Sequence, residues 1–202
     1  MATTPPTTAI GFNSPPPKGY PSLSPRGYPL RASERYIPVE KYLRTTYHPD
    51  RDYVDGHLEI RNTGNWEHGD LQSALVAYLR THAREWGIYA VAECRLQVKP
   101  DNFRIPDVMV VSREKKPELI IRDAPLLCIE VLSPDDTVKR IMCRVEDYIA
   151  MGVKAVWVLE PKRSEVLVVS RTESRWTDAR VLTVEGTAIR VDLDEIAADL
   201  AD

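Results

Sequence analysis

The sequence predicts an α/β (α+β) fold in which a mixed β-sheet is flanked by helices and preceded by an N-terminal hairpin. Three observations support this: a strand, helix, strand succession over residues 126–159, an amphipathic helix over residues 66–86, and an Asp55-Gly56 turn between two short strands. Two parallel strands need a long crossover connection, which a helix supplies. Further short apolar runs extend the sheet.

Composition is consistent with one sizeable folded domain. The chain has 202 residues, 43% of them hydrophobic, and a net charge of −3. We therefore expect a single domain over residues 34–202. Residues 1–33 are rich in proline and poor in large aliphatic side chains, so we expect a disordered or draped N-terminal arm there.

Several classes of protein are excluded or disfavoured by composition. No apolar run approaches the roughly 20 residues of a membrane-spanning helix, and the N-terminus lacks a hydrophobic signal core, so we expect a cytoplasmic protein without a membrane partner. The acidic balance gives no global positive field, so a nucleic-acid partner would have to meet a local basic patch or metal ions. Cys94, Cys128 and Cys143 are expected to be reduced core thiols rather than disulfides or zinc ligands.

The first elements are a short helix over residues 38–43, which proline suits at its first turn, and a hairpin around Asp55-Gly56. The helix over residues 66–86 follows, with Asn65 as its N-cap and Gly87 as its end.

Glu67 lies one turn before the apolar residue Leu71 of this helix. Residues four apart share a helix face, so we expect Glu67 to point toward the core side at the helix N-terminus, where the helix dipole favours an anion. The neighbouring His68 could reach a phosphate from this position, but a surface position is the stronger expectation.

Strands are then predicted over residues 88–92, 93–99 and 103–111. In the last of these, Ile105, Asp107 and Met109 share one face. Pro106 removes a backbone donor, which predicts that the strand lies at an edge, begins at the proline or is bulged there. Asp107 is therefore an acid on an apolar face beside a break in the ladder.

A second acid, Glu130, lies inside the apolar run of residues 126–132. Ser133 and Pro134 then predict a helix with Ser133 at its N-cap and an end near Gly152. The near-continuous apolar run of residues 154–159 predicts a strand parallel to the one that carries Glu130. Three more strands are expected at residues 165–170, 180–184 and 189–191, and a short helix at residues 194–200.

An acid inside a buried strand is costly unless another group compensates its charge. Asp107 and Glu130 on neighbouring strands, with Glu67 on the earlier helix, are therefore expected to share a cation. Mg²⁺ binds through one or two carboxylates and keeps several waters, one of which can attack a phosphorus atom. A basic side chain would stabilise the same transition state, and the helix after Glu130 carries Lys139 and Arg144 on opposite flanks of its apolar stripe.

Several short motifs follow one another along the chain: Tyr53-Val-Asp-Gly56, Trp66-Glu-His68, Pro106-Asp107, Cys128-Ile-Glu-Val-Leu-Ser-Pro134, Tyr148-Ile-Ala-Met-Gly-Val153 and Val156-Trp-Val-Leu159. In this order they resemble the Uma-type restriction endonuclease family of bacteria, within the PD-(D/E)xK nuclease superfamily. The resemblance runs from about residue 39 to residue 169. It implies a restriction-endonuclease-like mixed sheet flanked by helices, a helix acid at Glu67, strand acids at Asp107 and Glu130, and Mg²⁺ as the metal, with Mn²⁺ as a substitute.

The chain departs from the superfamily pattern at the lysine. The residue two positions after Glu130 is Leu132, where the short motif has lysine. Uma-type members often place a lysine on the following helix, and ungapped spacing from Ser133 matches that position to Arg144, with Lys139 as the alternative. Arginine stabilises negative charge but does not accept a proton at neutral pH.

Three functions are consistent with these residues. The first is a Mg²⁺-dependent DNA endonuclease with metal ligands Asp107, Glu130 and Glu67 and a positive charge from Arg144 or Lys139. The second is a nuclease-fold module that binds nucleic acid or assembles without cleavage, which the acidic net charge and Leu132 favour. The third is a metal-dependent hydrolase of another substrate. A homodimer is expected by analogy, because two sites are the simplest way to cut two strands.

Overall fold

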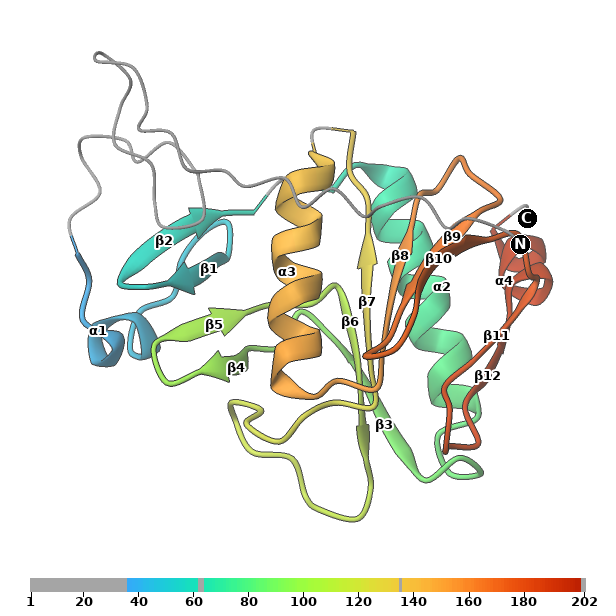
Figure 1. Ribbon diagram of the computed structural model, residues 1–202, viewed down its shortest axis with the longest axis horizontal. Helices are drawn as coiled ribbons and strands as arrows, with labels where there is room; N and C mark the ends of the chain where they lie inside the picture. The colour runs from blue at the N-terminus through green and yellow to red at the C-terminus, as the bar shows by residue number, and fades with distance from the viewer. Residues whose placement is uncertain (1–35, 62–63, 135, 201–202) are drawn as a thin grey trace, which may run out of the picture. The chain divides into compact units, whose positions relative to one another are not determined.

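The fold is described from a computed structural model that places residues 36–61, 64–134 and 136–200 (Figure 1). The N-terminal arm predicted over residues 1–33 lies outside these described residues. The helices are α1 (Val39–Leu43), α2 (Trp66–Thr81), α3 (Val138–Met151) and α4 (Leu193–Asp199). The strands are β1 (Arg51–Val54), β2 (His57–Ile60), β3 (Ile88–Ala92), β4 (Leu96–Lys99), β5 (Asn102–Arg104), β6 (Val108–Ser112), β7 (Leu127–Val131), β8 (Ala155–Leu159), β9 (Val166–Val169), β10 (Ser174–Thr177), β11 (Val181–Thr183) and β12 (Arg190–Asp192).

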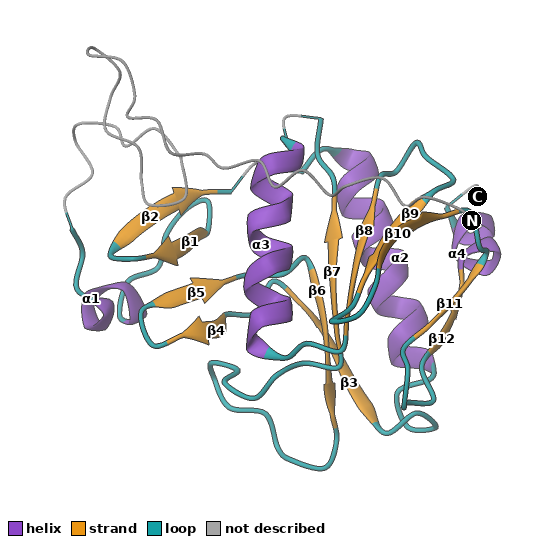
Figure 2. Cartoon of the chain, in the orientation of Figure 1, coloured by secondary structure: helices purple, strands orange, loops and turns teal. Residues whose placement is uncertain are grey.

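A mixed six-stranded sheet forms the centre of the fold, with the strand order β10-β9-β8-β7-β6-β3. Strands β7 and β8 are parallel and are joined by α3, whereas the other neighbours pair antiparallel. Figure 2 shows α2 and α3 beside the strands of this sheet. The predicted α/β (α+β) class, with a mixed sheet flanked by helices, is confirmed.

The two faces of the sheet bury separate cores because successive side chains of a strand point to opposite faces. On one face, Val108 and Val110 of β6 pack in a core with α2 and α4. On the other, Met109 of β6 and Cys128 of β7 pack in a core with α3 and β4. This alternation places Asp107 and Glu130, each two residues from one of these latter positions, toward α3.

The predicted hairpin forms part of a second, four-stranded sheet with the order β2-β1-β5-β4. Its two-residue turn has positive φ at both Asp55 (50°) and Gly56 (84°), the conformation for which Asp-Gly is favoured. Tyr42, Tyr53 and Phe103 form the core of this part of the chain. The Tyr42 and Tyr53 rings stack with centroids 4.8 Å apart.

The single strand predicted over residues 103–111 is in fact two strands in two sheets. β5 ends at Arg104 in the smaller sheet, and β6 begins at Val108 in the larger one. Pro106 lacks a backbone donor and lies in the link between them, in agreement with the predicted break. Asp107 therefore lies where the chain enters the central sheet.

Two helix boundaries differ from the prediction. Thr137, and not Ser133, is the N-cap of α3, because Asp136 closes a turn on Ser133 before the helix begins. Helix α2 begins after its predicted N-cap Asn65 but ends at Thr81, ahead of a turn segment in which His82 and Trp86 stack. β10 was not predicted. No helix within the described ranges is long and apolar enough to cross a membrane.

Candidate active site

Asp107 and Glu130 lie beside each other at the ends of two adjacent strands. Val108 of β6 pairs with Ile129 of β7, so the residue before Val108 and the residue after Ile129 occupy neighbouring positions in the antiparallel pair. Both acids are buried, with 3% and 0% of their surface exposed. The two acids are therefore neighbours as predicted, although Asp107 lies in the link before β6 and not within a strand.

Asp107 is held by groups from three parts of the chain. Its Oδ1 accepts a 2.7 Å hydrogen bond from Arg61 Nη2, and its Oδ2 accepts a 2.8 Å bond from the Val131 backbone N–H. His68 Nε2 lies 3.4 Å from Oδ2. Burial favours the neutral acid, but contacts with His68, Arg61 and Val131 outweigh it and lower the pKa of Asp107. The bond to Asp107 in turn raises the pKa of His68.

Glu130 is contacted from one face of α3. Arg144 Nη1 donates a 3.0 Å hydrogen bond to Oε2, and the Tyr148 hydroxyl donates a 2.5 Å bond to Oε1. Residues four apart on a helix project to one side, which is why Arg144 and Tyr148 reach the same carboxylate. Complete burial raises the pKa of Glu130 to about 7, although Arg144 and Tyr148 act in the opposite direction.

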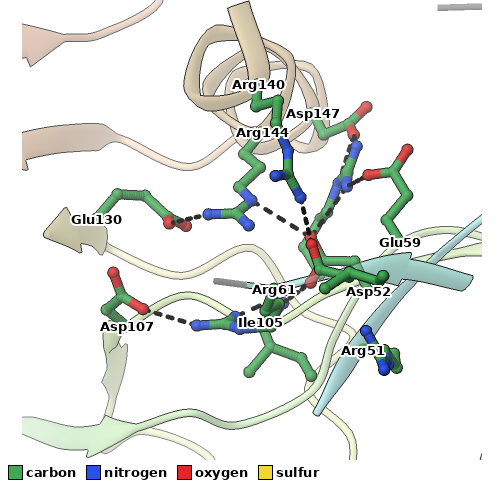
Figure 3. Close-up of polar contacts among 12 residues, drawn as sticks. Arg51, Asp52, Glu59, Arg61, Ile105, Asp107, Glu130, Arg140, Arg144 and Asp147 are labelled. Atoms are coloured by element: carbon green, nitrogen blue, oxygen red, sulfur yellow. Dashed lines mark hydrogen bonds and ion pairs between the residues drawn. The ribbon is translucent and has the colours of Figure 1, made fainter. Parts of the chain in front are cut away.

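Asp52 of β1 links the two arginines to the smaller sheet (Figure 3). Its Oδ2 lies 3.4 Å from Arg144 Nε and accepts a 3.0 Å bond from Arg104 Nη1, and its Oδ1 lies 3.9 Å from Arg61 Nη1. The pKa of Asp52 is lowered because these guanidinium groups outweigh the effect of burial. Arg104 also contacts Glu59 and Asp147. Buried acids and arginines therefore connect the small sheet, α3 and the candidate site.

The predicted orientation of Glu67 is wrong. Its side chain is 44% exposed and forms an ion pair with Lys162 at 3.1 Å. The buried face of α2 runs through residues 68, 71, 75 and 79, in steps of three and four, so its first member is His68. His68, which was expected at the surface, is the residue of this turn that reaches Asp107. The role of Glu67 as a metal ligand stays a prediction.

The two predicted basic residues have different surroundings. Arg144 is buried against Glu130 and Asp52, whereas Lys139 is exposed in the first turn of α3. The structure thus brings Arg144 to the acid pair. Arg61, Asp52 and Tyr148 were missed by sequence reasoning. The one available signal was Arg104, a charge between Phe103 and Ile105 in a strand-like run, which predicts a buried acid partner.

The comparisons with known proteins agree with this architecture. A family model named Uma2, described as "Putative restriction endonuclease", matches residues 39–200. The chain belongs to the Uma2 family. The Uma-type resemblance inferred from the motifs is thereby confirmed.

A solved structure has the same fold as this chain. It is described as a putative nuclease belonging to DUF820 from Anabaena variabilis ATCC 29413, and it aligns with a TM-score of 0.72 at 20% identity. The alignment covers 81% of this chain and 99% of that one, so the two proteins share a fold. No curated protein matches the chain.

Restriction-endonuclease-like families generally use divalent metals, and the acid pair can be tested against that requirement. No group of three or more His, Cys, Asp or Glu side chains within the described residues is arranged to hold a metal ion. Asp107 and Glu130 nevertheless provide two adjacent carboxylates, and Mg²⁺ commonly takes only one or two, with water or substrate oxygens completing its shell. The pair therefore fits Mg²⁺ in donor type.

Proposed function

We propose that this Uma2 protein is a Mg²⁺-dependent endonuclease that hydrolyses phosphodiester bonds in DNA. The observation that carries the proposal is the buried pair of carboxylates, Asp107 and Glu130, at neighbouring strand ends of a nuclease-like fold. Two acids placed side by side in a core are unfavourable unless cations compensate them, and such arrangements are frequent at functional sites.

Asp107 and Glu130 are the ligands that we assign to the metal. A bound Mg²⁺ or Mn²⁺ would supply a water of lowered pKa and neutralise charge on the phosphoryl oxygens. Val131 and His68 fix the orientation of the Asp107 carboxylate, and Tyr148 fixes that of Glu130. Glu67 is a candidate third ligand only through water or after a change of side-chain rotamer, because it is paired with Lys162.

Arg144 supplies the positive charge that a lysine supplies in the superfamily motif. Its guanidinium lies on Glu130 and its pKa is raised by the surrounding acids, although burial acts against this, so it remains a cation at any ordinary pH. It can stabilise an anionic transition state but cannot remove a proton from water. Lys139, exposed at the start of α3, is the alternative cation.

A second function is favoured by a specific observation. Arg61 already pairs with Asp107, Arg144 already pairs with Glu130, and all four side chains are buried. A nuclease-fold module that binds nucleic acid, or assembles with other chains, without cleaving DNA could retain a site whose acids are neutralised in this way. The two functions predict different responses to metal.

Plasmid cleavage with purified protein separates these functions. Supercoiled DNA is incubated with Mg²⁺, Mn²⁺ or EDTA and the wild type, Asp107→Asn, Glu130→Gln and the control Asp123→Asn, whose side chain is 77% exposed. We expect metal-dependent nicking by the wild type and the control, and a loss of at least about 100-fold in the two site variants.

Equal cutting by Asp107→Asn would contradict the proposal. DNA binding without cleavage under any of these conditions would support the second function instead. A screen of other phosphodiesters then tests whether a non-DNA substrate is hydrolysed.

A further inference from the structure

The two arginines that contact the acids of the candidate site are held differently. Arg144 contacts two carboxylates, those of Glu130 and Asp52, from the middle of α3. Arg61 directly follows β2, and within the described part of the chain its side chain donates one hydrogen bond, to Asp107 Oδ1. Its Nη1 is buried 3.9 Å from Asp52 Oδ1 and forms no hydrogen bond with a described residue. Arg61 therefore has the longer contact with Asp52, at 3.9 Å against 3.4 Å for Arg144.

The two oxygens of Asp107 also differ. Oδ2 accepts the Val131 backbone N–H and contacts His68, so the central sheet and α2 occupy it. Oδ1 contacts the Arg61 guanidinium at 2.7 Å. Oδ1 is therefore the Asp107 oxygen with fewer contacts to offer a cation, and it already has a positively charged partner.

We propose that Arg61 competes with the divalent metal for Asp107 Oδ1 and thereby sets the metal affinity of the site. The inference rests on the proposed function, because it takes Asp107 as a metal ligand. Metal binding is then an exchange: the Arg61–Asp107 ion pair breaks as the metal–Asp107 bond forms, and the guanidinium moves away while Arg144 keeps its contact with Asp52.

Charge balance supports exchange over simple addition. Each acid of the pair already has a guanidinium partner, Arg61 for Asp107 and Arg144 for Glu130, so the pair offers no uncompensated negative charge to a divalent cation. A divalent metal ion placed beside these two guanidinium groups, in a poorly hydrated site, would be repelled by them. Withdrawal of Arg61 from Asp107 relieves part of that repulsion.

Metal binding by Arg61→Gln tests the proposal without using catalysis. Binding of Mn²⁺ alone is measured by titration calorimetry and electron paramagnetic resonance on full-length protein, with Arg122→Gln as the matched control. Arg122 is also an arginine paired with a carboxylate, but it is half-exposed. We expect Arg61→Gln to bind Mn²⁺ about tenfold more tightly than the wild type, the order of effect for removing one nearby like charge.

We expect Arg122→Gln to bind Mn²⁺ with wild-type affinity. The Arg61→Gln/Asp107→Asn double variant should lose the tighter Mn²⁺ binding of Arg61→Gln. Unchanged or weaker Mn²⁺ binding by folded Arg61→Gln would overturn the exchange while leaving the proposed function intact. Absence of binding in every variant, the wild type included, would instead overturn the proposed function.

A second measurement covers the case in which Arg61→Gln does not fold. The side-chain N–H resonances of arginine are followed in ¹⁵N-labelled wild type during titration with Mg²⁺, and the Arg61 signals are assigned with Arg61→Lys. Exchange predicts that the Arg61 signals shift with the same midpoint as Mg²⁺ binding. Saturable binding of Mg²⁺ at Asp107 without any shift of the Arg61 signals would contradict it.

Discussion

The Tyr148 hydroxyl donates a 2.5 Å hydrogen bond to Glu130 Oε1, and both residues are completely buried. Tyr148 thereby holds one oxygen of the acid while Arg144 holds the other. Because the bond favours the charged carboxylate, Tyr148 acts against the burial that raises the pKa of Glu130.

Tyr148→Phe is therefore expected to reduce stability by about 1–3 kcal/mol, since Glu130 would keep its burial and lose a charge-assisted hydrogen bond. Urea unfolding at pH 8 measures the change. Tyr89→Phe is the control, because its ring contact with Arg113 is preserved and an effect within about 0.5 kcal/mol is expected. Equal effects of the two variants would show that the bond to Glu130 is not stabilising.

Glu130 should also make stability depend on pH. Burial raises its pKa from 4.5 to about 7, so the folded state holds a proton that the unfolded state releases within that window. The contribution of Glu130 to the free energy of unfolding is thus fully present below about pH 4.5 and is lost as the pH rises through about 7.

Glu130→Gln lacks this titration. The difference in unfolding free energy between Glu130→Gln and the wild type should therefore shift in favour of the variant from pH 5 to pH 8, as measured by urea unfolding in matched buffers. Parallel pH profiles for the two proteins would contradict the raised pKa of Glu130. Asp52 and Asp107 have lowered pKa values, so their titration changes stability only at lower pH. Both proteins contain these two residues.

Asp52 is expected to be the most sensitive structural position of the network. Asp52→Asn removes the buried counter-charge that Arg104 and Arg144 share, although Arg104 keeps Asp147 and Arg144 keeps Glu130. Breaking one partner of a buried pair typically costs about 3–5 kcal/mol. Asp123→Asn, which breaks an exposed pair with Lys115, should cost less than about 1 kcal/mol. Guanidinium unfolding compares the two. A similar small loss in both variants would show that Asp52 is dispensable for stability.

Arg144 and Lys139 can be separated by activity if the proposed function is correct. Arg144→Gln should lower plasmid cleavage at least about 100-fold because it removes the cation next to Glu130, and Arg144→Lys should recover part of the loss. Arg122→Gln serves as the exposed control. If Lys139→Gln loses cleavage while Arg144→Gln retains it, the assignment of the functional cation moves to Lys139.

Much of the fold could be predicted because its signals are local. The Asp55-Gly56 turn, the Asn65 cap and the strand, helix, strand unit around α3 each depend on residues close in sequence. The acid pair could be predicted for the same reason, since alternation within each strand fixes the face of Asp107 and Glu130 and short connections make the strands neighbours.

What the tertiary structure alone decided is which charges meet. Arg61 and Asp107 lie 46 residues apart, and Arg104 and Asp52 lie 52 apart, so no local period relates them. Likewise, adjacent residues on a helix point about 100° apart, and the packing of α2 on the sheet turned His68 inward and Glu67 outward. Sequence determines the elements and the acids because these depend on local geometry, whereas the partners of buried charges depend on how distant elements pack.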